Sequence, residues 1–399
     1  MKLAELNAEA QGELAQLQAL RRELHQIPEF GLDLKQTKAR LLREIESLGE
    51  IAHGKRLESM VLRIEGGQPG QTVLLRADMD ALKVVEDSGE SFASTNGHMH
   101  ACGHDLHMAI GVGAAKLLHR HRDQLRGSVD IWFQPGEEGH GGADVMIEEG
   151  ALTAFGDKPI AAYGIHVFSN YQSGVFASKP GPLMASAGDI LVTFKGVGGH
   201  GSMPWLAKDP ITPMLEAMNA IPALVTKHFS AFDPVIVNIG WVAAGDTATT
   251  NVVPAEAKFG ATIRTFSDVN FKQIRVALEE LMQATAKAHG IEVDVIFTPS
   301  SHVVNNDKQA VARAQRVLTE AFGADAYVDL PAPIAGGEDF ASILREVPGA
   351  FVFLGAMPSD LNEETAEVNH SNKARFDDSV VGVGAALLAA LAFDELTNR

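Results

Sequence analysis

The feature that most constrains the fold of this chain is an alternation between short apolar segments and longer segments of helical periodicity. The apolar segments are bounded by turn-forming residues, and they comprise residues 61–64, 72–77, 128–133, 161–167 and 350–355. Apolar residues recur at helical spacing in residues 8–26, 36–48, 104–121, 209–229, 269–289, 308–322 and 376–396. Because strands that are apolar on both faces must be covered on both faces, the alternation predicts an α/β domain with a mostly parallel central sheet.

The middle of the chain follows a different order of elements. Between residues 187 and 299 the pattern is strand, helix, two successive strands, helix and strand, with turn-forming residues on both flanks. A β-α-β-β-α-β order is typical of a small α+β domain. We therefore predict that 187–299 is an inserted domain, and that 1–186 and 300–399 together form the main domain.

The charge balance of the chain narrows the range of its partners. The 399 residues include 33 Lys and Arg against 51 Asp and Glu, which gives a net charge of −18. A surface this acidic repels phosphate backbones and anionic lipids, so we expect neither a nucleic acid nor a membrane as a partner. An anionic substrate would need a local basic residue to hold it.

The cysteine content and the apolar runs predict a cytoplasmic protein. The single cysteine, Cys102, excludes an internal disulfide. The first 20 residues lack the basic region and apolar run of a secretory signal. The longest apolar run, near the C-terminus, is shorter than the roughly 20 residues that a membrane span needs, and we expect it to be a buried terminal helix.

Metal-type ligands are concentrated in one short segment. The sequence HMHACGHDLHMA places His98, His100, His104 and His107 around Cys102. Imidazole and thiolate are ligands that suit zinc and its neighbours in the divalent series. The segment opens a helical pattern, so its side chains can converge near a helix N-terminus. A histidine-rich loop with one buried structural thiol is an equal alternative on this segment alone.

Further candidate ligands lie near the ends of predicted strands. Glu137 and Glu138 follow the strand at 128–133, His166 lies in the strand at 161–167, and His370 lies in a polar loop before the last helix. Acidic pairs are common in turns, and a single core histidine is usually structural. Their joint placement favours a metal-binding site over these structural explanations, because open α/β sheets bind ligands at the carboxyl ends of their strands.

Eight motifs occur in this chain in the order in which one enzyme family carries them. They are RADMDAL (76–82), HMHACGHDLHMA (98–109), FQPGEEG (133–139), GIHV (164–167), GGHGSMP (198–204), TTNVVPAEAKFGATIR (249–264), GGEDF (336–340) and NHS (369–371). The chain therefore resembles the hippurate hydrolase and N-acyl-amino-acid amidohydrolase branch of the di-zinc exopeptidases, which includes plant auxin-conjugate hydrolases. The resemblance covers nearly the whole chain. It implies a di-zinc exopeptidase-like catalytic domain with an inserted lid and dimerisation domain.

The resemblance implies a role for each matching residue of the main domain. The metal ligands that it implies are Cys102, His104, Glu138, His166 and His370. Glu137 matches the general base that takes a proton from the attacking water. Asp80 looks like the carboxylate that orients a metal ligand, and Asp78 is a weaker candidate for the same role.

The resemblance also implies residues that contact the substrate. His200 is similar to the residue that, in dimeric relatives, reaches the partner's active site and polarises the scissile carbonyl. Asn251 and Arg264 match residues that hold the substrate, and the planar fork of Arg264 suits a free carboxylate. Gly336 and Gly337 match a loop that borders the substrate.

These roles imply a metal-dependent hydrolysis of the amide bond in N-acyl amino acids. The substrates would be hippurate-like, N-acetyl or aryl-acyl conjugates, and the products a carboxylic acid and a free amino acid. The ligand set suggests two divalent ions, with zinc expected and manganese, cobalt or nickel as alternatives. We expect a homodimer, or a tetramer, by resemblance to dimeric relatives.

Three alternative functions remain open from the sequence. A dipeptidase of the same superfamily would require a free α-amine on its substrate. A thiol enzyme would use Cys102 as nucleophile and His104 as base. A binding protein could have kept the fold and lost the chemistry, although a site that only holds metal has no need of Glu137.

Two departures from the family pattern bear on the wall of the substrate pocket. Lys83 stands where relatives usually have Pro after RADMDAL, and Asn372 and Lys373 replace the usual Pro after the late histidine. Neither departure removes a predicted ligand, but both leave the identity of the substrate open. Trp205 could face the substrate, and we expect it instead to pack at the edge of the inserted domain.

Overall fold

The computed structural model describes residues 1–397, which divide into two compact units. Unit 1 comprises Met1–Leu183, Val304–Ala332 and Asp339–Arg399, and unit 2 comprises Met184–Val303 and Pro333–Glu338. Unit 2 extends the predicted insertion by a few residues at each end. It also takes in Pro333–Glu338, which the sequence pattern had assigned to the main domain, so Gly336 and Gly337 belong to unit 2.

Backbone pairing explains why this later segment joins unit 2. Ile334 forms a parallel bridge with Met184, and the Ala185 amide donates a hydrogen bond to the Ile334 carbonyl over 3.1 Å. A Cβ added at Gly337 would lie 2.9 Å from the Cβ of Ala187, so glycine permits a close approach to the strand there. Such pairing joins residues far apart in sequence and leaves no trace in local periodicity.

Unit 1 is built on an eight-stranded sheet. In spatial order its strands are β1 (Glu50–His53), β2 (Met60–Glu65), β4 (Arg126–Gln134), β3 (Gln68–Asp78), β5 (Ala161–Phe168), β16 (Gly349–Gly355), β6 (Phe176–Ser178) and β15 (Tyr327–Asp329). The central strands from β4 to β16 are parallel, and antiparallel pairs join β1 to β2, β2 to β4 and β16 to β6. The predicted α/β architecture with a mostly parallel central sheet is confirmed.

The parallel register brings the carboxyl ends of neighbouring strands to one edge of the sheet. Asp78, the last residue of β3, lies beside Gln134, the last residue of β4. On the other side of β3, Arg76 lies beside Gly164 of β5. The loops that follow β3, β4 and β5 therefore leave the sheet next to one another. This is the arrangement expected if the candidate ligands at the strand ends form one site.

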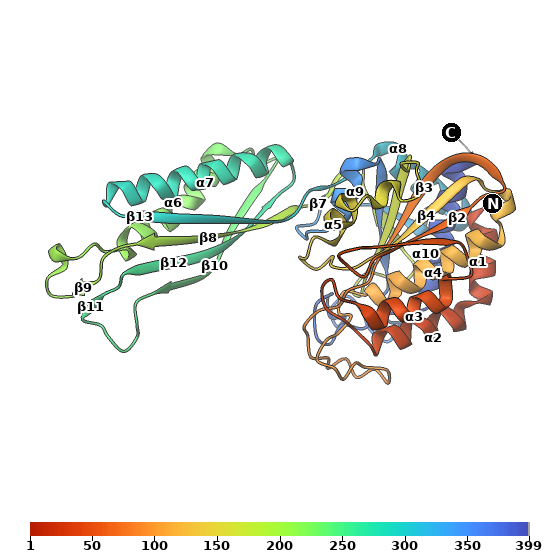
Figure 1. Cartoon of the computed structure of the whole chain (residues 1–399), viewed down its shortest axis with the longest axis horizontal. Coiled ribbons are helices and arrows are strands. Elements are labelled where there is room, and N and C mark those ends of the chain that lie inside the picture. Colours follow the sequence, from red (N-terminus) through yellow and green to blue (C-terminus); the bar gives the residue numbers. More distant parts are fainter. Residues whose placement is uncertain (398–399) are drawn as a thin grey trace. The chain divides into compact units, whose positions relative to one another are not determined.

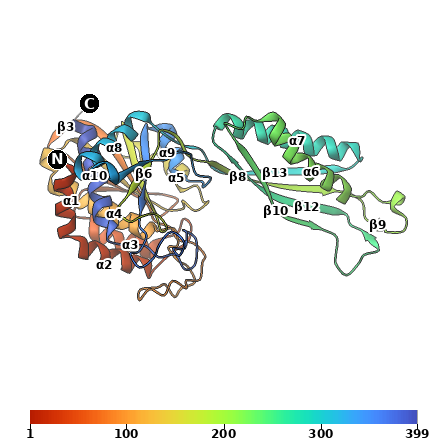
Figure 2. The same cartoon turned by 180° about the vertical axis from the view of Figure 1, so that it is seen from behind.

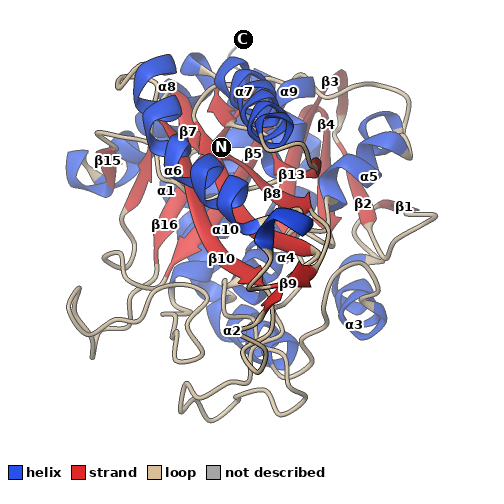
Figure 3. Ribbon diagram, turned by 90° about the vertical axis from the view of Figure 1, so that its left-hand side faces the viewer, coloured by secondary structure: helices blue, strands red, loops and turns tan. Residues whose placement is uncertain are grey.

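The helices of unit 1 form layers on this sheet (Figure 1). α4 (His104–Arg120) and α10 (Val380–Thr397) pack against the strands, and α1 (Leu3–Gly12), α2 (Leu14–His25) and α3 (Lys35–Ile45) pack on those two helices. The remaining elements are α5 (Gly142–Glu148), α8 (Lys308–Phe322), α9 (Phe340–Glu346), the paired strands β7 (Gly181–Met184) and β14 (Val304–Asn306), and single 3-10 turns at Arg122–Gln124, Ala151–Thr153 and Ala324–Ala326. Figure 3 distinguishes the helices from the strands by colour.

The periodic segment at residues 8–26 forms two helices rather than the single helix that its pattern predicts. α1 ends at Gly12 and α2 begins at Leu14, and between them Glu13 has φ −108° and ψ 3°, outside the helical region. Glycine disfavours a helix interior because its backbone loses the most conformational freedom on folding. The break at Gly12 follows from this preference.

The last helix, α10, is part of the core. By length and composition alone this 18-residue helix could cross a membrane, which corrects the expectation that its apolar run is too short. In the structure 78% of the segment is buried inside the chain, against α1, α4 and the sheet. A helix that is apolar all round is buried in a core or spans a membrane. The predicted burial of the terminal helix is confirmed.

Unit 2 has the predicted β-α-β-β-α-β order. Its elements are β8 (Ser186–Lys195), α6 (Ile211–His228), β10 (Val235–Ala244), β12 (Glu256–Thr265), α7 (Asp268–Ala288) and β13 (Glu292–Ser301). The strands form an antiparallel sheet in the order β10-β12-β8-β13. A ribbon of β9 (Gly199–His200) and β11 (Val252–Val253) and a 3-10 turn at Pro204–Leu206 complete the unit.

The helices of unit 2 cover one face of its sheet. α6 and α7 lie side by side on that face, as Figures 1 and 2 both show. Successive side chains of a strand point to opposite faces, so Ile190, Val192 and Phe194 of β8 are buried in the core of unit 2 while Leu191 is exposed. This alternation is typical of an antiparallel sheet with one open face.

Candidate metal centre

The N-terminus of α4 brings Cys102 and His104 to the carboxyl edge of the sheet. Gly103 lies between them and precedes the helix with φ 87°, in the left-handed region that favours glycine. A Cβ at Gly103 would lie 2.4 Å from the Cγ2 of Val167. Glycine at this position therefore allows the turn before α4 to pack against the end of β5, which carries His166.

The other four predicted ligands converge around the Cys102 thiol. Its Sγ lies 3.4 Å from His166 Nε2 and 3.2 Å from His370 Nε2. The potential ligand atoms of Cys102, His104 and His166 all lie within 4.8 Å of one another, and so do those of Cys102, Glu138 and His370. Because both triplets contain Cys102, the five residues form one continuous cluster, which fits a centre of two metal ions.

The chemistry of these residues fits divalent cations. Within residues 1–397, His104 Nε2 is buried and has no hydrogen-bond partner. Buried polar atoms in native proteins are nearly always satisfied, so an unsatisfied nitrogen at this place calls for a ligand. A thiolate, three imidazoles and a carboxylate form a donor set typical of zinc and related ions.

Hydrogen bonds orient two of the imidazoles toward the cluster. His104 Nδ1 lies 2.9 Å from the Asp80 carbonyl oxygen, and His166 Nδ1 lies 2.9 Å from the Val167 carbonyl oxygen. Because a carbonyl only accepts, each Nδ1 must carry the proton. The lone pair on each Nε2 then faces the other ligands, which is the usual arrangement of metal-binding histidines.

Asp80 holds both glutamates of the FQPGEEG loop. One carboxylate oxygen accepts from the Glu137 amide over 2.9 Å, and the other accepts from the Glu138 amide over 3.1 Å. Its Oδ1 also lies 3.6 Å from His104 Nδ1. The resemblance implies only that Asp80 orients a ligand, and the structure adds that it fixes the backbone of the adjacent acid pair.

A buried network beneath the centre joins Asp78, the weaker candidate for orienting a ligand, to Arg76 and Asp339, which had no predicted role. Asp78 forms an ion pair with Arg76 and lies 2.6 Å from His107 Nδ1. Arg76 also donates to Asp339 Oδ1 over 3.0 Å. Burial acts to raise the pKa of Asp78, but the positive charge of Arg76 outweighs it and holds that pKa well below its usual range. Asp78 therefore stays ionised as an anchor for its neighbours.

His107 supports the sheet edge and does not bind a cation. Its Nδ1 donates to Asp78, and its Nε2 accepts from the Val167 amide over 2.9 Å. Asp78, His104 and His107 also have ligand atoms within 4.8 Å of one another. Since both ring nitrogens of His107 are engaged, it has no lone pair left for a metal ion, and this triplet is not a candidate site.

The charges of the cluster favour an ionised Glu138 carboxylate, because hydrogen bonding to His370 outweighs burial and lowers its pKa. Hydrogen bonds to Cys102 and then to Glu138 raise the pKa of His370 to about 10. Burial acts to lower the pKa of His104, but Asp78 and the hydrogen bond to Asp80 outweigh it and raise that pKa well above its usual value. Protons and divalent cations compete for such ligand atoms.

Two of the predicted substrate residues lie together at one end of unit 2. In the ribbon, His200 pairs with Val252, and the Gly201 amide donates to the Asn251 carbonyl over 2.7 Å. His200 and Asn251 are both exposed. Trp205 is 74% exposed in the neighbouring turn, so the expectation that it packs at the edge of the domain is wrong.

Arg264 and Gly337 lie at the opposite end of the unit-2 sheet. Arg264 of β12 pairs with Ala187 of β8, the residue that Gly337 approaches closely. From Glu256, where β12 begins beside the ribbon, to Arg264 the strand spans roughly 27 Å at about 3.4 Å per residue. The structure therefore separates the predicted substrate residues into two groups.

The departures from the family pattern link two loops of unit 1. Lys83 Nζ lies 4.2 Å from the centre of the Phe30 ring. In the same loop, the Asp87 amide donates to the Asn372 carbonyl over 2.8 Å, and its carboxylate lies 3.8 Å from Lys373 Nζ. Polar contacts thus replace the prolines expected at these positions.

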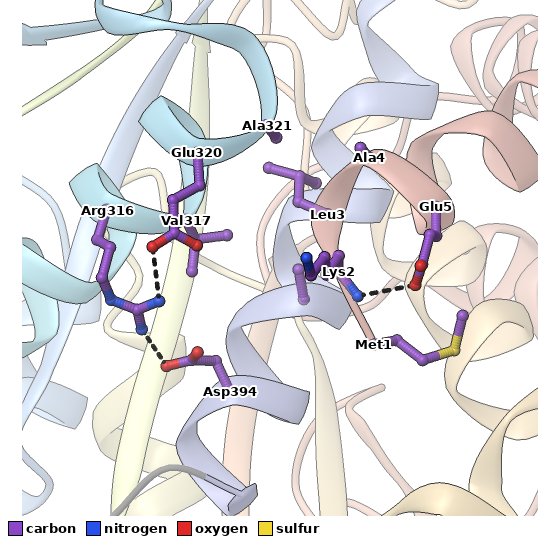
Figure 4. A pocket seen from close by; sticks show the side chains of 11 residues that line it. Met1, Lys2, Leu3, Ala4, Glu5, Arg316, Val317, Glu320, Ala321 and Asp394 are labelled. Atoms are coloured by element: carbon purple, nitrogen blue, oxygen red, sulfur yellow. Dashed lines mark hydrogen bonds and ion pairs between the residues drawn. The ribbon is translucent and has the colours of Figure 1, made fainter.

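A separate surface pocket of about 540 Å³ is lined by the start of α1 and by residues of α8 and α10 (Figure 4). Arg316 in its wall pairs with Glu320 and with Asp394. None of the predicted site residues lines this pocket. Its size alone does not connect it with the ligand cluster.

Comparison with known proteins gives matches that cover this whole arrangement. The model of Peptidase family M20/M25/M40 matches residues 74–394. Thermostable carboxypeptidase 2 of Saccharolobus solfataricus is 33% identical over 381 residues, which are 94% of this chain and 93% of that protein. IAA-amino acid hydrolase ILR1-like 2 of Arabidopsis thaliana is 33% identical over 387 residues, 95% of this chain and 85% of that protein. The structure of the Bacillus subtilis YxeP protein, described as a dinuclear metal-binding peptidase, matches with a TM-score of 0.81 at 28% identity, covering 97% of this chain and 99% of that chain.

Proposed function

This chain belongs to Peptidase family M20/M25/M40 and is a metal-dependent hydrolase, and we propose that it cleaves the amide bond of N-acyl amino acids. The observation that carries the proposal is the position of Glu137 beside the five-ligand cluster. Its Oε2 lies 3.9 Å from the unpartnered His104 Nε2. A site that only stored metal would not need this additional carboxylate.

The residues of the cluster divide the catalytic work between them. Cys102, His104, Glu138, His166 and His370 would hold two divalent ions, zinc by ligand preference. When bound, such ions would polarise the carbonyl of the substrate as Lewis acids and would lower the pKa of a bound water molecule from 15.7 to about 7. Glu137 accepts a proton from the water that attacks the carbonyl carbon. When the C–N bond breaks, Glu137 returns that proton to the leaving amine nitrogen, as general acid–base catalysis requires.

The substrate class follows from the charge of the chain and from Arg264. On a protein with net charge −18, a free carboxylate needs a local cation. Arg264 offers the planar fork that binds a carboxylate with two parallel hydrogen bonds. Its Nη1 already donates to the Ile263 carbonyl over 2.9 Å, which helps to hold the guanidinium in place.

Arg264→Lys is expected to reduce kcat/KM for N-acyl amino acids about 10- to 100-fold, because hydrogen bonds to charged groups contribute about 1.5–3 kcal/mol. The loss should appear mainly as a higher KM. The check is steady-state kinetics with N-acyl amino acids and with their C-terminal amides. The amides should be poor substrates of the wild type and little affected by the substitution. Equal losses on both substrates would contradict carboxylate binding by Arg264.

A substrate panel separates this activity from that of a dipeptidase. The metal-reconstituted protein would be assayed with N-acetyl, N-benzoyl and indole-3-acetyl amino acids and with dipeptides that have a free α-amine. Turnover of the acylated compounds supports the proposal, and the preferred acyl group defines the substrate. Turnover confined to the free dipeptides would favour the dipeptidase.

A homodimer is part of the proposal, because one copy of unit 2 cannot bring its two groups of substrate residues together. His200 and Arg264 lie at opposite ends of the sheet, farther apart than the length of a small N-acyl amino acid. If both contact one substrate, they come from two copies of the chain. β10 lies at the edge of this sheet with Ile236, Trp241 and Val242 exposed, and such an edge can pair with a second copy.

Complementation tests this arrangement. His200→Ala and Glu137→Gln should each be nearly inactive, and equal amounts allowed to exchange subunits should recover about a quarter of the wild-type activity. About half of the randomly formed dimers are mixed, and each mixed dimer contains one intact site. The mass in solution should be that of a dimer or a tetramer. A monomer with full activity, or the absence of any recovery after proven exchange, would refute the shared site.

A further inference from the structure

The loop that carries His370 holds this residue in an unfavourable backbone conformation. Within residues 1–397, His370 is the one non-glycine residue with positive φ, at 74°. Left-handed conformations of such residues cost free energy and persist only where the surroundings enforce them. The His370 amide donates to the Ala101 carbonyl over 2.9 Å, and its Nε2 lies 3.2 Å from both Cys102 Sγ and Glu138 Oε1, yet the side chain stays half exposed. The restraint must come in part from neighbouring residues.

The residue before His370, Asn369, is hydrogen-bonded through its side chain to the segments around the cluster. Its Nδ2 donates to the Val167 carbonyl over 2.9 Å and to the Cys102 carbonyl over 3.2 Å. Its Oδ1 accepts from the amide and the hydroxyl of Ser169, each over 3.0 Å. Two donors and two acceptor positions are all that an amide side chain offers. Asn369 uses every one of them on the segments that surround the cluster.

Each partner of Asn369 belongs to a segment that carries a predicted ligand. Cys102 is the ligand that both triplets share, and Asn369 Nδ2 lies 3.9 Å from its Sγ. The Val167 carbonyl is the group that accepts from His166 Nδ1 and so selects the ring tautomer of that ligand. Asn369 itself precedes His370. One side chain therefore joins three segments that are far apart in the sequence.

We propose that Asn369 is a positioning residue that holds Cys102, His166 and His370 in the geometry that binds the metal ions. The inference rests on the proposed two-metal centre and assigns no ligand atom to Asn369 itself. Partners that orient the ligands of a metal typically change its affinity 10- to 100-fold when they are removed. A side chain that only stabilised the loop would change the thermal stability of the protein and leave its affinity for metal unaltered.

The test is a titration of the metal-free full-length protein with Co²⁺. Because Cys102 is the sole cysteine of the chain, the thiolate-to-cobalt charge-transfer absorption reports on this ligand alone. For Asn369→Ala we expect Co²⁺ affinity about 10- to 100-fold below wild type and a weaker or shifted absorption band. The matched control is Asn362→Ala, because Asn362 also accepts amide hydrogen bonds in this loop, from Glu364 and Thr365, but within residues 1–397 is hydrogen-bonded to no ligand segment. The control should bind Co²⁺ as the wild type does.

A second variant keeps the test decisive if the alanine variant folds poorly. Asn369→Asp retains both acceptors for Ser169 and loses the two N–H donors. Its added negative charge would by itself favour a cation, so weaker binding in this variant reflects lost positioning. Wild-type affinity and absorption in both Asn369 variants would overturn the inference and leave the metal centre standing. A wild-type protein that binds no Co²⁺ would overturn the metal centre and this inference with it.

Discussion

Glu137→Gln is expected to lower kcat by a factor of about 10² to 10⁴ while KM and the metal content stay close to those of the wild type. The amide has the shape of the carboxylate but cannot accept a proton from water. The backbone of Glu137 is held by Asp80 through a 2.9 Å hydrogen bond, and this bond survives the substitution. The loss should therefore be confined to the chemical step. Turnover of an N-acyl amino acid and elemental analysis of the same sample provide the measurement.

The neighbouring glutamate is the matched control for this prediction. Glu138 Oε1 lies 3.2 Å from His370 Nε2 and belongs to the triplet around Cys102. Glu138→Gln removes a charged ligand, so it should lower the metal content as well as the turnover. Two adjacent carboxylates would thus give different outcomes in the metal assay. Wild-type turnover in Glu137→Gln would remove this residue from the mechanism, and metal loss in both variants would make it a ligand.

Removal of divalent cations by a chelator is expected to abolish hydrolysis, and addition of Zn²⁺, Mn²⁺, Co²⁺ or Ni²⁺ should restore it to different extents. Without a cation, the groups left around Cys102 offer no Lewis acid for the carbonyl. The alternative in which Cys102 is a nucleophile predicts the reverse pattern, with activity that survives chelation and is lost to iodoacetamide while the metal is retained.

The surroundings of the thiol favour the first outcome. Cys102 is 7% exposed, and its Sγ lies within 3.4 Å of two imidazole nitrogens, those of His166 and His370. Coordination of a cation uses all of these lone pairs at once, whereas a nucleophile needs one base and access to substrate. The measurement is turnover before and after chelation, with the metal content followed in parallel. Undiminished activity in a protein shown to be metal-free would refute the two-metal mechanism.

Most of the architecture could be predicted from local patterns. The period of two in β8 and the mostly apolar buried segments of β3, β4 and β5 reflect which faces of each strand are buried, and burial acts on each residue in place. The same holds for the helix α10, whose apolar surface predicts a core position. The break between α1 and α2 was missed because a single glycine interrupts an otherwise continuous helical pattern.

The candidate ligands could be named from the sequence because their chemistry is a property of the residue type. Imidazole, thiolate and carboxylate groups bind divalent ions in any fold, and their order along the chain matches a known family. The roles of His107, Arg76 and Asn369 could not be predicted in this way. Each of them acts through hydrogen bonds to partners on other segments, and a polar residue in a motif gives no local signal of its partner.

By itself, therefore, the sequence determined the alternation of strands and helices, the inserted domain and the set of candidate ligands, because periodicity and side-chain chemistry are local properties. Only the tertiary structure decided that Cys102 is common to two ligand triplets, that Pro333–Glu338 joins unit 2, and that His200 and Arg264 lie at opposite ends of one sheet. These facts depend on strand register and on contacts between distant segments. Such contacts form only when the whole chain packs around its cores.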